Sequence, residues 1–155
     1  MDRPLDLTRR FLANLGRGAR DAASMLLAPD IEWYGSVGGL EPGLARGREA
    51  VLRSFEDYSG MWSGLHFESR SIVVDGDRVL ALMVEHARGI GSGVEVDHGI
   101  AILLTTENGM ITNIVTYLDV PQAYVDFGIE PPDVADLEAG GVYELRDGSP
   151  VEIEA

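Results

Sequence analysis

The chain has 155 residues, of which 26 are acidic and 12 are basic, and its formal net charge is −14. All 12 basic residues are arginines, and the sequence holds neither lysine nor cysteine. These absences exclude Schiff-base chemistry, thiol nucleophiles, disulfides and thiolate metal sites. The acidic balance, with no basic patch, excludes the phosphate neutralisation that binding to nucleic acid or an anionic membrane requires.

The length and an apolar fraction of 45% predict one globular domain. The first residues carry charges and no long apolar core, which argues against a secretory signal. No apolar run approaches the roughly 20 residues that span a membrane. We therefore expect a cytoplasmic protein.

The first third of the chain reads as helical. Apolar residues recur at helical spacing in three segments, which predicts helices over Leu5–Leu15, Ala19–Leu27 and Arg48–Met61. A short strand is expected over Asp30–Tyr34, and a glycine-rich loop over Gly35–Gly47.

From residue 66 onward the pattern changes to strands separated by turn signals. Strands are predicted over Phe67–Val74, Arg78–Arg88, Val94–Thr106 and Met110–Val120, followed by one closing helical turn over Gln122–Phe127. Three helices followed by a mostly antiparallel sheet predict an α+β domain with the helices packed on one sheet face.

The last segment differs in charge from the rest. Residues 130–155 hold eight acids against one arginine, whereas residues 1–129 hold 18 acids and 11 arginines. We predict a domain over residues 1–129 and an appended acidic tail, mobile or loosely docked, over residues 130–155. A short hairpin around Asp147 and Gly148 is the alternative for part of this tail.

Both faces of the predicted strands are apolar along much of their length. Alternation separates Glu85 from His86 and Asp97 from His98, and we expect Glu85 and Asp97 to share one face. Three helices can cover only one face of the sheet. The other face must then meet another subunit or the tail, and we predict a homodimer that forms through the outer side of the sheet.

Five short segments carry a family resemblance: Ala28–Tyr34, Ala45–Val51, Asp77–Leu80, Asn108–Ile111 and Tyr117–Asp119. Together they resemble the SnoaL-like branch of the nuclear-transport-factor-2-like superfamily, over about residues 4–129. The resemblance implies a strongly curved sheet that forms a cone, with an internal pocket between the sheet and the helices. That superfamily includes polyketide cyclases, ketosteroid isomerases, epoxide hydrolases and non-catalytic binding proteins.

The resemblance can be tested residue by residue. The general base of the steroid isomerases would fall at or beside Gly35 and their oxyanion donor near Ala101, so neither position has an ionisable group. The three catalytic positions of the epoxide hydrolases correspond to Met83, Glu85 and Thr116, and Glu85 alone keeps the required chemistry. Neither classical mechanism is therefore expected.

The remaining candidates for proton transfer are Glu85 and Asp97, with Asp119 as a weaker third acid at a strand end. A carboxylate inside an apolar cone has a raised pKa and can carry a proton near neutral pH. The competing interpretation is that Glu85 pairs with Arg88 or another arginine and only stabilises the sheet.

Aromatic and apolar side chains are expected to form the walls of the pocket: Trp33, Tyr58, Trp62 and Met83. Aromatic residues at helical spacing are more often simply core. The three histidines, His66, His86 and His98, fall on different predicted strands without helical metal spacing, so no metal site is expected. His86 and His98 are interpreted as interface residues, and the alternative is that one of them acts as a general base if their face of the sheet lines the pocket.

These observations leave two functional hypotheses. The first is a cofactor-independent isomerase, cyclase or hydrolase that uses carboxylate acid–base catalysis on a small apolar or polycyclic substrate. The second is a non-catalytic ligand-binding or protein-assembly module of the same fold, with the acidic tail facing a partner.

Overall fold

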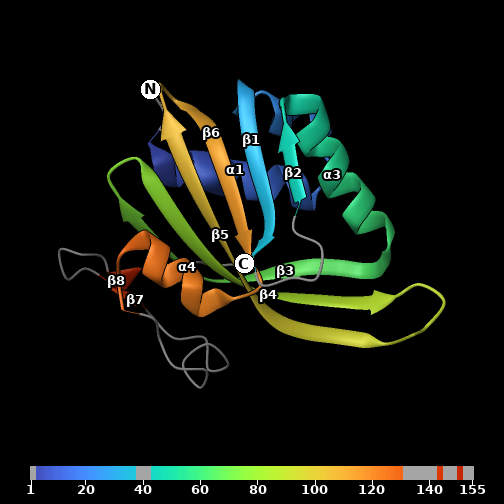
Figure 1. The fold of residues 1–155 in the computed structure, drawn as a ribbon. Helices are drawn as coiled ribbons and strands as arrows, with labels where there is room; N and C mark the ends of the chain where they lie inside the picture. Colours follow the sequence, from blue (N-terminus) through green and yellow to red (C-terminus); the bar gives the residue numbers. More distant parts are fainter. Residues whose placement is uncertain (1–2, 38–42, 131–142, 145–149, 152–155) are drawn as a thin grey trace.

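The computed structural model describes residues 3–37, 43–130, 143–144 and 150–151 (Figure 1). Its elements follow in chain order: α1 (Pro4–Gly16), α2 (Arg20–Ser24), β1 (Leu27–Val37), β2 (Gly43–Arg46), α3 (Arg48–Gly60), β3 (Trp62–Asp75), β4 (Arg78–Gly89), β5 (Glu95–Glu107), β6 (Met110–Tyr117), α4 (Val120–Phe127), β7 (Tyr143–Glu144) and β8 (Pro150–Val151).

Six strands form one strongly curled sheet in the order β2-β1-β6-β5-β4-β3 (Figure 1). The pairing of β1 with β6 is parallel, and the other four pairings are antiparallel. The predicted α+β cone with three N-terminal helices is therefore confirmed. A fourth helix, α4, replaces the single closing turn that the sequence predicted.

The largest differences from the sequence prediction lie around β1. The second helix is shorter than expected because β1 already begins at Leu27, where the chain pairs with Ile111 of β6. The expected loop contains β2, which pairs antiparallel with β1 from Gly43 to Arg46. The longer β1 and the added β2 both satisfy backbone N–H and C=O groups of β1, which would otherwise form the edge of the sheet.

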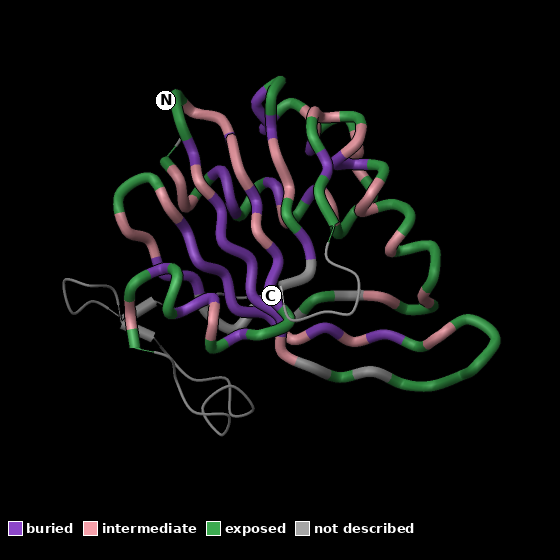
Figure 2. The backbone as a smooth tube through the Cα atoms, in the orientation of Figure 1, coloured by how far each residue is buried: buried purple, intermediate pink, exposed green. Residues whose placement is uncertain are grey.

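Helices α1, α2 and α3 pack on one face of the sheet, which we call the inner face. Phe11 of α1 is fully buried, and its ring meets that of Phe55 of α3 edge to face, with centroids 6.2 Å apart. Figure 2 shows that burial is concentrated in the middle of the sheet and falls off towards the β4–β5 hairpin. Burial of apolar area here is the main force that holds the helices to the sheet.

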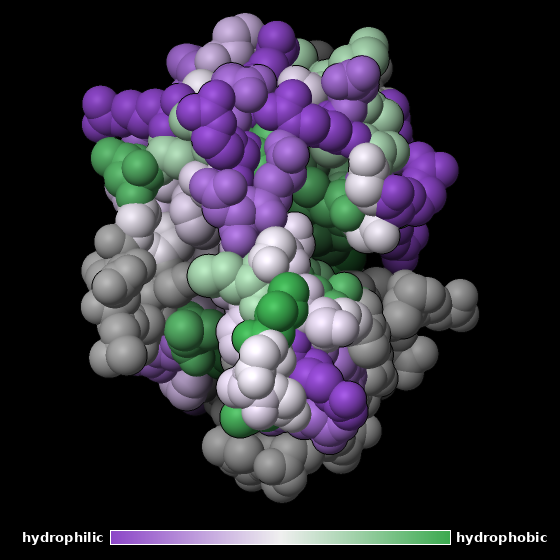
Figure 3. All heavy atoms as spheres, turned by 90° about the vertical axis from the view of Figure 1, so that its right-hand side faces the viewer, coloured by the Kyte–Doolittle hydropathy of each residue, from purple (hydrophilic) through white to green (hydrophobic). Residues whose placement is uncertain are grey.

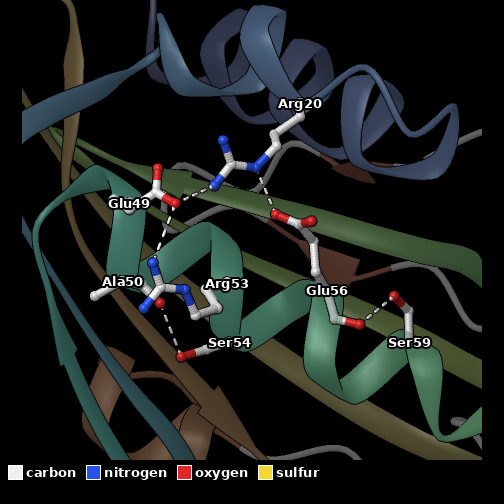
Figure 4. Close-up of polar contacts among 7 residues, drawn as sticks. All are labelled: Arg20, Glu49, Ala50, Arg53, Ser54, Glu56 and Ser59. Carbon is white, nitrogen blue, oxygen red and sulfur yellow. Dashed lines mark hydrogen bonds and ion pairs between the residues drawn. The ribbon is translucent and has the colours of Figure 1, made fainter.

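An arginine links two of these helices at the surface (Figure 4). Arg20 of α2 contacts Glu49 at 2.8 Å and Glu56 at 2.5 Å, both on α3, and Arg53 also reaches Glu49 at 3.4 Å. Exposed ion pairs of this kind add little to the free energy of unfolding. Their role is to orient α2 relative to α3.

Helix α4 covers part of the opposite, outer face, as Figure 1 shows. Its apolar residues form a second buried cluster with strands β3 to β6: Val73, Leu80, Leu82, Ala101, Leu103, Tyr117, Val120, Ala123, Tyr124 and Phe127. Arg78 of β4 secures the end of the helix, because it donates to the carbonyl oxygen of Phe127 at 2.9 Å and lies 4.9 Å from the centre of that ring.

The expectation that only another subunit or the tail could cover the second apolar face was therefore wrong. A helix of the same chain covers it over the part that α4 reaches. Homodimer formation through the rest of the outer face stays a prediction.

Little of the acidic tail belongs to the described part of the chain. Tyr143 pairs antiparallel with Val151 and Glu144 with Pro150. Asp147 and Gly148, around which a short hairpin was considered, lie outside the described residues, and the division at residue 129 stays a prediction. Within the described ranges, no helix is long and apolar enough to cross a membrane.

Candidate functional site

A buried carboxylate lies on the inner face of β4. Glu85 has no exposed surface, and its Oε1 atom accepts a hydrogen bond from the hydroxyl group of Tyr58 on α3. In register, Glu85 stands opposite Phe67 of β3 and His98 of β5. The side chain of His98, like that of His66, lies outside the described part of the structure.

The environment of Tyr58 keeps its phenol protonated. Burial raises the pKa of Tyr58 above its ordinary value, and the hydrogen bond to Glu85 and the charge of that carboxylate raise it further. The indole of Trp62 acts in the opposite sense on this pKa, and the two rings are tilted with centroids 6.1 Å apart. The Trp62 N–H is buried and makes no hydrogen bond of ordinary geometry to any described residue.

Trp33 fills the region where the steroid isomerases would place their base. Its indole N–H donates to the hydroxyl oxygen of Thr116 at 2.8 Å, and its ring lies 5.5 Å from that of Phe55. A Cβ atom on Gly35 would come within 2.1 Å of this ring. Any side chain at Gly35 would therefore have to displace Trp33, which agrees with the absence of an acid there.

Met83 lies two residues before Glu85 on the same face of β4, where it is 2% exposed and packs within the inner core. It therefore serves as a core residue in this structure. Of the predicted wall residues, Tyr58 and Trp62 are the two that lie beside the carboxylate site, while Trp33 packs towards Thr116.

Asp97 lies on the other side of the sheet. The register of β4 and β5 pairs His86 with Asp97 and Glu85 with His98, so the expectation that Glu85 and Asp97 share a face was wrong. The Asp97 side chain is 72% exposed, and its Oδ1 atom contacts Nδ1 of His86. A shift of one residue in register exchanges the two faces of a strand.

Asp119 stands at the start of α4, away from the inner face. It is exposed, and its Oδ1 atom accepts a hydrogen bond from the backbone N–H of Gln122 at 3.2 Å. This is the arrangement of a helix N-cap, in which a side-chain oxygen satisfies a free N–H of the first turn. Neither Asp97 nor Asp119 is brought to Glu85.

The partnership of Tyr58 with Glu85 was missed by sequence reasoning, which treated Tyr58 as a wall. A signal was present, because Tyr58 follows Val51 and Phe55 on the stripe of α3 that faces the sheet. A phenol that is buried by such a stripe needs a polar partner inside, and an acid on a facing strand supplies one.

Figure 3 looks onto the end of the molecule from which the β4–β5 hairpin projects. A recess with apolar residues in its depth opens there, between the charged surface above and the tip of the hairpin below. Among the described residues, no three histidine, aspartate or glutamate side chains gather in a way that could hold a metal ion.

The sequence matches the family described as the SnoaL-like domain over residues 8–114. The chain belongs to this family. No curated protein matches this SnoaL-like chain significantly.

Solved structures with the same fold are numerous. An NTF2-like protein from Burkholderia xenovorans is 24% identical, with a TM-score of 0.64 over 74% of this chain and 87% of that protein. An NTF2-like protein of unknown function from Burkholderia pseudomallei is 16% identical, with a TM-score of 0.68 over 81% and 97% of the two chains. A ketosteroid isomerase-like fold from Catenulispora acidiphila, solved with trimethylamine, is 19% identical, with a TM-score of 0.63 over 79% and 92%. At these identities the likeness shows the fold alone.

Proposed function

We propose that this SnoaL-like protein is a small-molecule enzyme, an isomerase, cyclase or hydrolase without a cofactor, in which Glu85 carries the proton. The observation that supports this function is the wholly buried carboxylate of Glu85, which accepts a hydrogen bond from Tyr58 on the helical side of the cone. Burying a carboxylate is costly, and a position that keeps one inside an apolar layer is a typical place for acid–base chemistry.

The two groups complement each other chemically. Glu85 can accept a proton from a C–H bond beside a carbonyl group or from an attacking water molecule. Tyr58, whose pKa is raised by burial, keeps its proton and can donate a hydrogen bond to the carboxylate or to a substrate oxygen that gains charge. The Tyr58 and Trp62 rings and the apolar recess favour a small, flat, apolar substrate.

The decisive experiment is a turnover screen with apolar ketones, polyketide-like esters and epoxides, on the wild-type protein and three variants. We expect Glu85→Gln to abolish whatever turnover the screen finds and Tyr58→Phe to reduce it. Glu107→Gln removes an exposed acid at the β5–β6 turn and should leave the turnover unchanged. Undiminished turnover in Glu85→Gln would exclude Glu85 as the proton carrier.

The alternative is a non-catalytic ligand-binding or assembly module. The packing of Met83 into the core and of the Trp33 ring against Gly35 supports it, because these side chains occupy space inside the cone. A module of this kind would bind members of the same compound set without converting them. Its affinity for an apolar ligand would then change little in Glu85→Gln, whereas an enzyme would lose turnover and keep binding.

A further inference from the structure

A polar hollow lies on the outer face, on the opposite side of the sheet from Glu85. Its volume is about 400 Å³, within the range of small-molecule sites, and strands β3, β4 and β5 line it with Ser63, Gly64, His86, Ala87, Arg88, Glu95 and Asp97. Every lining side chain longer than the methyl group of Ala87 is polar.

The charged groups of this outer hollow are arranged in pairs across β4 and β5. His86 Nδ1 contacts Asp97 Oδ1, and Arg88 Nη2 contacts Glu95 Oε1 at 2.6 Å. The register places the two pairs side by side on one face, two residues apart along each strand. Ser63 of β3 stands opposite Arg88 and adds a hydroxyl group to the same row.

Cross-strand ion pairs often do no more than stabilise a sheet, by about 0.2–1 kcal/mol each. The exposed pair of Arg88 and Glu95 fits that description when it is considered alone. The difference here is that both pairs and a hydroxyl group line one concavity, and that the His86 side chain is only 28% exposed within it.

We propose that the outer hollow binds a small, uncharged, polyhydroxylated molecule of monosaccharide size. Each carboxylate of the walls already has a partner, Asp97 in His86 and Glu95 in Arg88, so a charged ligand would have to displace one of these partners to form an ion pair of its own. A ligand with hydroxyl groups breaks neither pair. Its hydroxyls donate to the exposed carboxylates of Asp97 and Glu95 and accept from Arg88 and Ser63, since each hydroxyl is both donor and acceptor.

The test compares three probes that share one carbon skeleton and differ in charge: glucose, gluconate and glucosamine. Backbone amide shifts of the ¹⁵N-labelled full chain are followed as each probe is added. We expect saturable shifts with glucose along β4 and β5 at positions 86–88 and 95–97, and binding of gluconate and glucosamine at least about tenfold weaker. Equal or tighter binding of either charged probe, or no saturable shift with glucose, would overturn the proposal.

Variants separate a built site from general surface binding. Asp97→Asn and Ser63→Ala should each weaken glucose binding about fivefold or more, whereas Glu107→Gln, an exposed acid at the other end of β5, should leave it unchanged. Equal weakening in Glu107→Gln would show non-specific binding and sink the proposal. Light scattering of the same samples gives a further check. If a dimer forms that Asp97→Asn abolishes and glucose shifts no resonance, the face is an interface and the ligand site is refuted.

Discussion

Removal of one hydroxyl group tests whether the buried carboxylate site is a tightly coupled unit. Tyr58→Phe deletes the donor to Glu85 Oε1 and leaves the aromatic ring in place. A hydrogen bond to a charged group contributes roughly 1.5–3 kcal/mol, and the full burial of Glu85 favours the upper half of that range. We therefore expect the free energy of unfolding to fall by about 2.5 kcal/mol, which lowers Tm by about 5–10 °C in a chain of this size.

The chain contains its own control for this substitution. Tyr34 donates to Glu32 Oε2 at 2.6 Å, so it makes the same phenol–carboxylate hydrogen bond, but at an exposed position on β1. Solvent replaces that bond when it is lost, and Tyr34→Phe should leave the urea midpoint unchanged. The two variants differ in burial and not in chemistry.

Urea denaturation followed by circular dichroism measures both variants, together with Glu85→Gln and the double variant Tyr58→Phe/Glu85→Gln. The coupling energy from this cycle should lie between about 0.5 and 3 kcal/mol, as found for residues in one hydrogen-bond network. The hydrogen bond does not organise the site if Tyr58→Phe changes stability as little as Tyr34→Phe does. The same conclusion follows if the losses of stability in Tyr58→Phe and Glu85→Gln simply add in the double variant.

Three other predictions follow from the structure. Gly35→Ala should reduce the free energy of unfolding by about 1–3 kcal/mol in urea denaturation, because its Cβ would overlap the Trp33 ring. Gly43→Ala should cost far less, because no atom of the described residues lies within 4 Å of the Cβ that it would add. Similar losses in the two variants would contradict the Trp33 packing. Burial raises the pKa of Tyr58 and of Tyr117, and the neighbouring carboxylates of Glu85 and Asp126 respectively raise it further. The stability that each tyrosine contributes is therefore complete below about pH 10, the pKa of a tyrosine in the unfolded chain. Above that pH it is lost, by at most about 1.4 kcal/mol per pH unit for each tyrosine. Tyr58→Phe should reduce this alkaline slope in denaturation series, and an unchanged slope would exclude the tyrosine. Self-association through the part of the outer face that neither α4 nor the hollow occupies predicts a dimeric mass in light scattering at micromolar concentration, which a monomeric mass would contradict.

The parts of the fold that the sequence predicted well are those with strong local patterns. The helices α1 and α3 have clear apolar stripes, and the turns at Gly76 and Gly109 require a positive φ that glycine adopts easily. Strand β2 was missed because its four residues acquire strand structure only through pairing with β1, a contact that no local pattern announces. The covering role of α4 was missed for a related reason, because a helix of eight residues depends on the surface against which it packs.

The sequence predicted part of the candidate site, the buried face of Glu85, but not the face on which Asp97 lies. The connection between β4 and β5 explains this difference. Alternation along one strand correctly separated Glu85 from His86, but it gives no information about the neighbouring strand. That relation is set where the hairpin closes, because the N–H of Gly89 donates to the carbonyl oxygen of Val94 at 2.8 Å and every later pair follows from this one. A closure shifted by one residue would bring Asp97 opposite Glu85 and bury a second carboxylate, at a cost that an apolar layer with one phenol donor could not offset. The observed closure instead leaves Glu85 in the dry interior and pairs Asp97 with His86 at the solvent-exposed surface. The register of a single hairpin therefore separates the buried carboxylate of the inner face from the charged groups of the outer face.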